Sequence, residues 1–400
     1  MRKIIECVPN FSEGRANRKI EQISAEVEKV PGVKLLDVAA DPHHNRTVLT
    51  FVGGPEAIKK ASYNAIARAA EIIDMVKHEG QHPRLGACDV CPFVPIQNVT
   101  MADCVTVANE LACEVGEKLR IPVFLYQEAA RFPERKDLAS IRAGQYEGLE
   151  AKLRDPRWKP DYGPAVFNKK SGATVIGARE FLIAYNVYLG TTDKEIAYRI
   201  AEIIRESGCL TTAEDGQRIR IPGIFRSVKA VGISLEESGV AEVSINLTNY
   251  RVAPMHLVFE KIKQLGQLGG ASVLHSEIVG LIPKEAILET GRFYQPGARS
   301  DKSLVEAAVR NLGLDSVQGF NPREKIIEYL IGAPLETRFL KGSQLRRSRN
   351  ATRIDHRGIS GGAGSQTSDA RWRFRGCAFR GAGSRTRVHG SRVLPKERLL

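Results

Sequence analysis

Apolar residues in the first third of the chain follow two spacings that alternate along the sequence. Short aliphatic runs predict β-strands at residues 4–8, 33–39, 46–52, 89–96 and 122–126. Apolar residues repeated every three or four positions predict amphipathic helices over residues 20–30, 58–72 and 108–119. Up to residue 96 the predicted order is strand, helix, strand, strand, helix, strand, and a further helix and strand extend this unit.

The same order of elements returns in the second half of the chain. Strands are predicted at residues 181–188, 227–234, 242–247 and 272–281, and helices at residues 196–203 and 256–265. Two β-α-β-β-α-β units indicate an α+β protein with two ferredoxin-like subdomains, each a sheet with helices on one face. The two halves show no sequence identity that supports a repeat, so this prediction depends on the pattern alone.

Residue composition indicates where the two subdomains begin and end. We expect an N-terminal subdomain over residues 1–178 and a C-terminal subdomain over residues 179–330. Residues 154–177 are rich in Pro, Gly, Lys and Ser, which is typical of a loop that crosses between subdomains. The last predicted helix covers residues 323–330. Residues 331–400 are dominated by Arg, Gly and Ser and lack apolar periodicity, which predicts a disordered basic tail.

The net charge of +13 lies entirely in residues 338–400 of that tail. Residues 338–400 hold 14 Arg and 2 Lys against 3 acidic residues, whereas residues 1–337 are balanced. The tail indicates either a shifted reading frame, because such translation loses the apolar pattern that folding needs, or a basic arm that binds nucleic acid through phosphates. We favour the first, because Arg without interleaved aromatic side chains is a weak signal for nucleic-acid binding.

Several protein classes find no support in the sequence. No run of roughly 18 apolar residues predicts a membrane span, and the start of the chain lacks the apolar core of a signal peptide, so we expect a cytoplasmic protein. A phosphate-binding Gly-Lys-Ser/Thr loop and a dinucleotide fingerprint are both missing, which speaks against ATP and NAD. Exposed sheet edges favour a homodimer.

The strongest candidate for chemistry is His82, in the stretch from His78 to Gly86. Pro83 favours an extended backbone at His82, and the flanking glycines are permissive joints, so the imidazole is expected on a loop before a strand. An imidazole titrates near neutral pH and suits proton transfer. On the residues alone, a solvated histidine is the more frequent outcome for such a position.

A second candidate stretch runs from Asp41 to Arg46. Its adjacent histidines, together with the Cys88-x-x-Cys91 pair, offer ligand types that zinc accepts. Neighbouring strand residues point to opposite faces, however, and no second Cys-x-x-Cys pair completes a site, so we expect no metal and interpret the cysteines as core residues. Arg46 is interpreted as a carboxylate clamp, or equally as a surface arginine at a strand start.

A third candidate is Asn10, in the opening segment between a predicted strand and helix. Backbone amides at such a helix start favour anions, and the Asn10 side chain can donate to a carbonyl or accept from an amine. The alternative is an ordinary helix cap that involves Ser12.

Six blocks of sequence, in register from residue 2 to about residue 337, resemble the formiminotransferase part of formimidoyltransferase-cyclodeaminases, the glutamate formimidoyltransferase family. The blocks cover residues 6–14, 45–48, 82–84 with 89–93, 126–131, 172–182 and 324–330. The resemblance implies an enzyme that moves the formimino group of N-formimino-L-glutamate to N5 of tetrahydrofolate, a co-substrate, with release of L-glutamate. Such an activity belongs to histidine degradation and one-carbon metabolism.

The resemblance also implies roles for individual residues. His82, in the His-Pro-Arg block, corresponds to the catalytic base, and Arg46 or Arg84 would hold the carboxylates of formiminoglutamate beside Asn10. The folate-contacting stretch of the family falls on Gly163, Pro164, Ala165, Val166, Phe167, Asn168, Lys169, Lys170, Ser171 and Gly172. The two lysines there would suit the glutamate carboxylates of a folate.

Two alternatives stay open within this expectation. A related one-carbon activity, such as formyl transfer from N-formylglutamate or cyclisation of 5-formyltetrahydrofolate, fits the same resemblance. A nucleic-acid-binding role of the tail is the alternative from a different class. In bifunctional relatives a helical cyclodeaminase domain follows at about Thr337, and the polar sequence found here does not predict that activity.

Overall fold

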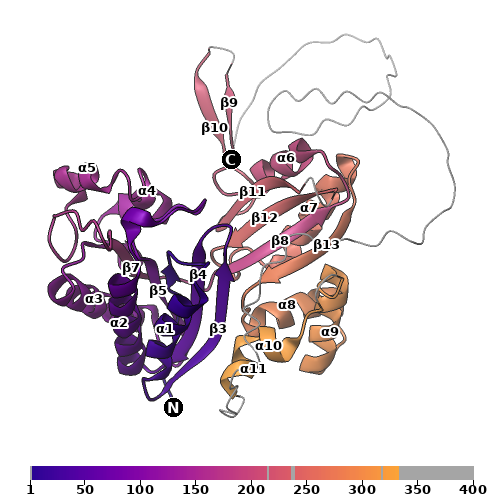
Figure 1. Cartoon of the computed structure of the whole chain (residues 1–400). Coiled ribbons are helices and arrows are strands. Elements are labelled where there is room, and N and C mark those ends of the chain that lie inside the picture. The colour runs from indigo at the N-terminus through magenta and orange to yellow at the C-terminus, as the bar shows by residue number, and fades with distance from the viewer. Residues whose placement is uncertain (1, 214–215, 236–238, 317–318, 333–400) are drawn as a thin grey trace, which may run out of the picture.

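The structure is a computed structural model that describes residues 2–213, 216–235, 239–316 and 319–332. The predicted basic tail, apart from its first two residues, lies outside the described residues, and so does the expectation that it is disordered. Figure 1 shows the described part as two sheet-and-helix units side by side. No helix among the described residues has the length and apolar character needed to cross a membrane.

The N-terminal unit is a mixed sheet with three long helices on one face and two short helices, at residues 138–142 and 149–154, against part of the other. Its strands are β1 (Ile4–Cys7), β2 (Asn10–Phe11), β3 (Val33–Asp41), β4 (Arg46–Gly53), β5 (Cys88–Gln97), β6 (Val123–Gln127) and β7 (Thr174–Ala178). The interrupted strand β1–β2 lies between β4 and β5, β3 forms one edge beyond β4, and β7 and β6 extend the sheet parallel to β5. The helices α1 (Asn17–Glu28), α2 (Pro55–Ile72) and α3 (Met101–Lys118) cover one face (Figure 1).

The C-terminal unit is an antiparallel sheet in the order β11-β12-β8-β13. Its strands are β8 (Ile183–Leu189), β11 (Val228–Leu235), β12 (Val240–Leu247) and β13 (Val273–Val279), with α6 (Lys194–Ile204) and α7 (Met255–Leu268) between them in sequence. In β8 every second residue is buried, starting at Ile183, and Tyr188 lies on the opposite face. This period of two places apolar side chains under the helices and leaves polar ones on the other face.

The predicted strands and helices are present, and the structure adds elements that the pattern did not predict. They include the helices α8 (Lys284–Tyr294) and α9 (Asp301–Leu312), the short helices α4 (Leu138–Arg142) and α5 (Leu149–Arg154), and the hairpin of β9 (Cys209–Thr212) and β10 (Arg218–Ile221). Strand β7 also lies at the end of what was predicted as a crossing loop. The predicted helix 323–330 is interrupted into α10 (Pro322–Lys325) and α11 (Ile327–Gly332), because Ile326 between them pairs with Ile282.

The two sheets share one apolar core at one end and separate at the other. Ile4, Val52 and Val94 of the N-terminal sheet belong to the core cluster of the C-terminal unit, and they lie on the sheet face opposite α1–α3. That face therefore packs against the second unit where its side chains are apolar. Polar side chains replace the apolar ones further along the same strands, and there the sheets leave a cleft.

Candidate functional site

The cleft between the two sheets has a volume of about 2170 Å³. Its N-terminal wall includes alternate residues of β1–β2 and β4, among them Glu6, Asn10 and Arg46. Its C-terminal wall includes Tyr188 and Glu277 from neighbouring strands. Strand register fixes the lining side chains that come from the two sheets, while Arg142 of a short helix and His82 of a loop complete the lining.

Two loops hold the predicted histidine at this cleft. The side chain of Asn45 donates to the carbonyl of Glu79 at 2.8 Å, and the Nε2 atom of His78 lies 2.9 Å from the carbonyl of Asn45. A Cβ atom at Gly80 would lie 2.4 Å from the carbonyl oxygen of His44, so only glycine allows this approach. The loop that carries His82 is therefore locked to the loop that precedes Arg46.

His82 is half-buried, lines the cleft and contacts Arg46 directly. The Nη1 atom of Arg46 donates to Nε2 of His82 at 2.7 Å, so the neutral ring carries its proton on Nδ1. Burial, and then the positive charges of Arg46 and Arg142, lower the pKa of His82 to about 3. The structure thus presents an unprotonated imidazole whose basicity is held down by neighbouring cations.

Arg46 is a cation with no carboxylate partner among the described residues. Burial, and then the neighbouring Arg142, lower the pKa of its guanidinium. Arg142 also lines the cleft but is bound to the buried carboxylate of Asp89. Arg46 is consequently the better placed of the two to take an anionic ligand.

Asp41 and His44 form a pair at the rim of the cleft. The Nδ1 atom of His44 lies 2.5 Å from Oδ2 of Asp41, whose other oxygen accepts from the backbone amides of His43 and His44. Burial opposes ionisation of Asp41, but these hydrogen bonds hold its pKa below the usual value. The pair orders the turn before Arg46.

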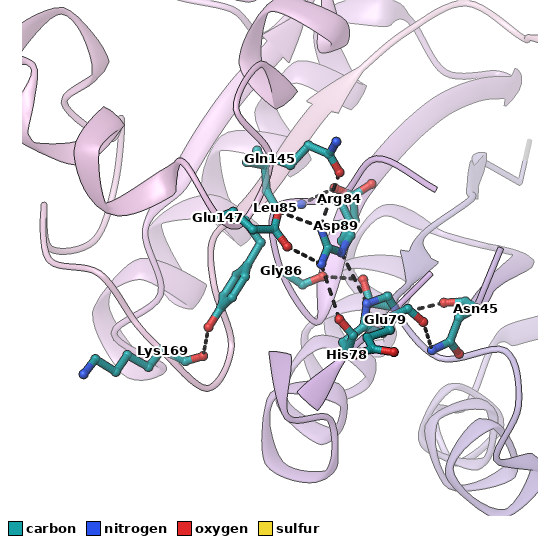
Figure 2. A network of polar contacts seen from close by, with 12 residues as sticks. Asn45, His78, Glu79, Arg84, Leu85, Gly86, Asp89, Gln145, Glu147 and Lys169 are labelled. Carbon is teal, nitrogen blue, oxygen red and sulfur yellow. Dashed lines mark hydrogen bonds and ion pairs between the residues drawn. The ribbon is translucent and has the colours of Figure 1, made fainter. Parts of the chain in front are cut away.

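Arg84 lies outside the cleft lining, although it comes from the same His-Pro-Arg block as His82. Figure 2 shows its guanidinium enclosed by Glu147, Gln145 and His78. It donates to both carboxylate oxygens of Glu147, at 2.6 and 2.9 Å, and is itself buried. This network joins the His82 loop to the segment before α5, and the role of Arg84 as a substrate clamp stays a prediction.

The stretch 163–172 lies beside this network, and none of its residues is among those that line the cleft. The hydroxyl of Tyr146 donates to the carbonyl of Lys169 at 2.5 Å, and the ring of Phe167 lies 5.3 Å from that of Tyr146. Figure 2 shows Lys169 next to the Arg84 network. Gly172 has a φ of +68° and pairs with Gly86, where an added Cβ would meet backbone oxygens. The stretch is therefore pressed against the start of β5, and its contact with folate stays a prediction.

The structure also places residues at the cleft that the sequence interpretation missed. Glu6, Arg142 and Arg179 line the N-terminal wall, and Tyr188 and Glu277 line the opposite wall. A signal for Glu6 existed, since it is the one charged residue within the apolar run from Ile4 to Val8. Arg142 and Arg179 carried no comparable signal, because each is an ordinary arginine until the fold brings it to the cleft.

The predicted core role of the two cysteines is confirmed. Cys88 and Cys91 are buried in the N-terminal core, and Cys91 lies 3.4 Å from Cys7, sulfur to sulfur. Within the described residues, no group of three or more His, Cys, Asp or Glu side chains is arranged to hold a metal ion.

Comparison with known proteins decides the family. Residues 4–179 match the N-terminal subdomain of the formiminotransferase domain, and residues 184–332 match the formiminotransferase domain. The chain belongs to the formiminotransferase family. The two formiminotransferase matches meet where β7 leads into β8, so the cleft lies between the two matched parts.

Two kinds of formiminotransferase relative are similar to the chain. Formimidoyltransferase-cyclodeaminase of Gallus gallus is 45% identical over 344 residues, which cover 85% of this chain and 62% of that protein. Glutamate formimidoyltransferases of Streptococcus pyogenes and Thermoplasma acidophilum are 42% and 45% identical over 94% and 92% of their lengths, and over 74% and 73% of this chain. The chain thus spans about three fifths of the length of the bifunctional relatives it matches.

Proposed function

We propose that the chain is a glutamate formimidoyltransferase, which transfers the formimino group of N-formimino-L-glutamate to N5 of tetrahydrofolate. The names of the Streptococcus and Thermoplasma relatives support this activity, because the matched regions cover nearly all of those proteins. The observation that carries the proposal is the contact between His82 and Arg46 at the cleft wall. This contact joins a neutral base to a cation that has no carboxylate partner among the described residues. Amidine exchange on a dianionic substrate requires both groups.

The proposed reaction needs two proton movements. When N5 of tetrahydrofolate bonds to the amidine carbon, it must lose a proton, and His82 accepts it at Nε2. The bond from that carbon to the glutamate nitrogen then breaks, and His82 returns the proton to the departing amine. The products are 5-formiminotetrahydrofolate and L-glutamate, and the base ends in its starting state.

Arg46 couples substrate binding to this proton transfer. A carboxylate of formiminoglutamate competes with His82 for the guanidinium, since a charged acceptor forms a stronger hydrogen bond than a neutral ring nitrogen. Moving Arg46 onto the substrate frees Nε2 of His82 and neutralises the nearest positive charge. The pKa of His82 then rises from about 3 towards its ordinary value, where the imidazole is an effective base.

The cleft also suits the simultaneous binding of both substrates. Its volume of about 2170 Å³ exceeds that of an ordinary drug-sized site, which is roughly 300 to 1,000 Å³. Arg46 and Arg179 provide cations for carboxylates, and holding both reactants together lowers the entropic barrier. The exposed Lys169 and Lys170 stand ready for the folate tail if it leaves the cleft past Gln145.

We further propose that both subdomains are ferredoxin-like. The strand orders β3-β4-β1-β5 and β11-β12-β8-β13 support this, because each pairs the first strand of its unit between the third and the fourth. A cytoplasmic location, a homodimer and the absence of a nucleic-acid partner stay predictions.

A donor-competition assay tests the proposed function. Purified protein is incubated with tetrahydrofolate and either formiminoglutamate or N-formylglutamate, and glutamate release and the modified folate are quantified. We expect turnover with formiminoglutamate and at most slight turnover with the formyl donor. Preference for N-formylglutamate would favour the formyl-transfer alternative, and turnover with neither donor would refute the proposed function.

A further inference from the structure

The cleft contains an acidic side chain that the proton transfer does not use. Glu6 lies on β1, in the middle of the N-terminal sheet, and its side chain faces the cleft with Asn10 of β2. Its exposed fraction is only 2%, and its neighbours in strand register are Val52 and Val94. An ionisable group is thus set in a largely apolar stretch of the cleft wall.

The carboxyl of Glu6 makes no hydrogen bond and no ion pair with any described residue. Burial raises its pKa to about 8, while the charges of Arg179 and Glu328 act on it in opposite directions. Its oxygens are not sealed inside the wall but open onto the cleft, and ionisable groups with strongly shifted pKa values concentrate at functional sites. An unpartnered carboxyl that lines a cleft is what a ligand with matching donors would complete.

We propose that Glu6 is a ligand-binding residue that accepts two parallel hydrogen bonds from a planar N–C–N group of a substrate. A carboxylate and an amidine-type edge match in shape, as a carboxylate and a guanidinium do, and the ligand supplies the donors that the protein lacks. This assignment rests on the proposed function. A ligand group with two donors favours the ionised form of Glu6, whereas an anionic group offers it no donors and would keep it protonated.

Both substrates of the proposed reaction contain such an edge. The pterin ring of tetrahydrofolate presents its 2-amino group beside N3–H, and formiminoglutamate presents a formamidine. Glu6 and Asn10 pair with Val52 and Val48 of β4, so they lie four residues apart along the sheet, roughly 13 Å. A group bound at Glu6 is therefore separated along the cleft from the end where His82 meets Arg46. This separation favours the pterin as the group at Glu6, because the formamidine carbon must reach His82.

Calorimetric binding to the full chain tests the assignment with two ligands used separately, 5-formyltetrahydrofolate and formiminoglutamate. Glu6→Gln keeps the shape of the side chain but replaces one acceptor oxygen by a donor. We expect it to weaken the binding of 5-formyltetrahydrofolate by roughly tenfold to a hundredfold and to leave the affinity for formiminoglutamate within threefold. Weaker binding of formiminoglutamate instead would identify the formamidine as the group at Glu6 and would contradict the placing of its carbon at His82.

Glu242→Gln is the matched control, because Glu242 is also a buried acid on a sheet strand but does not line the cleft. It should leave both affinities within threefold. A 2-desamino analogue of the folate ligand adds a test on the ligand side. If the pterin is the source, wild-type protein binds this analogue at least tenfold more weakly, and Glu6→Gln abolishes the difference.

The outcomes separate the two proposals. If wild-type protein binds both ligands and neither affinity changes in Glu6→Gln, the assignment of Glu6 is wrong while the proposed function stands. If wild-type protein binds neither ligand, the proposed function fails and the assignment of Glu6 fails with it. Should Glu6→Gln not fold, Glu6→Asp applies the same criterion, because it keeps the charge and withdraws the carboxylate by one methylene group.

Discussion

The two walls of the cleft are built from sheets with the same internal strand order, yet their polar side chains differ in how they are satisfied. On the C-terminal wall the hydroxyl of Tyr188 donates to Glu277 at 3.0 Å, and the Tyr188 ring stacks on His275. On the N-terminal wall, within the part of the chain that the structure describes, Arg46 has only the neutral His82 as a side-chain partner, and Glu6 has none. The common strand order therefore does not locate the chemistry, whereas unsatisfied groups do.

The unsatisfied groups of the N-terminal wall lower the stability of the folded chain and leave this wall able to bind a ligand. A buried carboxyl without a donor and a guanidinium without a carboxylate both raise the free energy of the folded chain. The C-terminal wall carries no such burden at Tyr188 or Glu277. We infer that the N-terminal wall performs the chemistry and the C-terminal wall closes and shapes the cleft.

The largest expected effect concerns the base. His82→Ala should lower kcat by about 10² to 10⁴-fold, the usual contribution of a general base. Tyr188→Phe on the opposite wall should stay within about threefold, because its hydroxyl serves Glu277 rather than the reaction. Initial rates of glutamate release, with thermal melting to verify folding, measure both. Equal losses in the two variants would remove the distinction between the walls.

The next effect concerns the arginines of the predicted clamp. Arg46→Gln should raise KM for formiminoglutamate by roughly tenfold to a hundredfold, the range for a lost charge-assisted hydrogen bond. Arg84→Gln should mainly lower the melting temperature, because Arg84 is buried and bound to Glu147. Steady-state kinetics of the two variants show which of the two arginines holds the substrate. A larger rise in KM for the Arg84 variant would restore it as the clamp.

A third effect concerns the stability cost of Glu6. Its pKa of about 8 exceeds the ordinary value of 4.5, so between these pH values the folded chain binds more protons than the unfolded chain. Below about pH 4.5 Glu6 is protonated in both states and the folded chain keeps its full stability. As pH rises through about 8 the buried side chain must ionise, and this stability is lost. Glu6→Gln should therefore raise the free energy of unfolding at pH 8 by about 1 to 3 kcal/mol.

Denaturant melts at pH 5 and pH 8 measure this change. Glu242, whose pKa burial raises to about 7, provides the comparison on the other sheet, and Glu242→Gln should stabilise the chain less. A Glu6 variant with unchanged stability at pH 8 would mean that the carboxyl finds a partner in solution.

The smallest effect is a change in one titration. In the free protein the imidazole of His82 should titrate far below 6.5, near 3, and Arg46→Gln should raise its pKa by removing the nearest cation. Binding of formiminoglutamate should shift the pKa in the same direction. Proton NMR of the ring protons follows the titration directly. If the pKa of His82 is the same in the Arg46 variant, Arg46 does not control the basicity of His82.

Much of the fold followed from apolar spacing. Strand β12 and helix α7 were predicted because their buried residues repeat at the periods of a strand and a helix. The hairpin of β9 and β10 was missed because its side chains are mostly exposed and show no apolar alternation. Helices α8 and α9 were not predicted, although both have buried faces.

The candidate site, like the fold, could be predicted from the sequence only in part. His82 was proposed because Pro83 and the flanking glycines indicate a displayed loop, and the structure places it at the cleft, where its catalytic role stays a prediction. The separation of Arg84 from His82 was not predictable from their spacing of two residues, because Glu147 comes from a distant segment. Glu6 was overlooked because a carboxyl within an apolar strand has meaning only when its lack of partners is known.

Chemical rescue of His82→Ala tests directly whether the side chain at position 82 transfers the proton. Imidazole is added to the variant with saturating formiminoglutamate and tetrahydrofolate, and the rate of glutamate release is followed at fixed pH. If the side chain at position 82 moves the proton, the rate rises with imidazole concentration and varies with the pKa of substituted imidazoles. A variant that binds both substrates but whose rate is indifferent to imidazole would contradict the account.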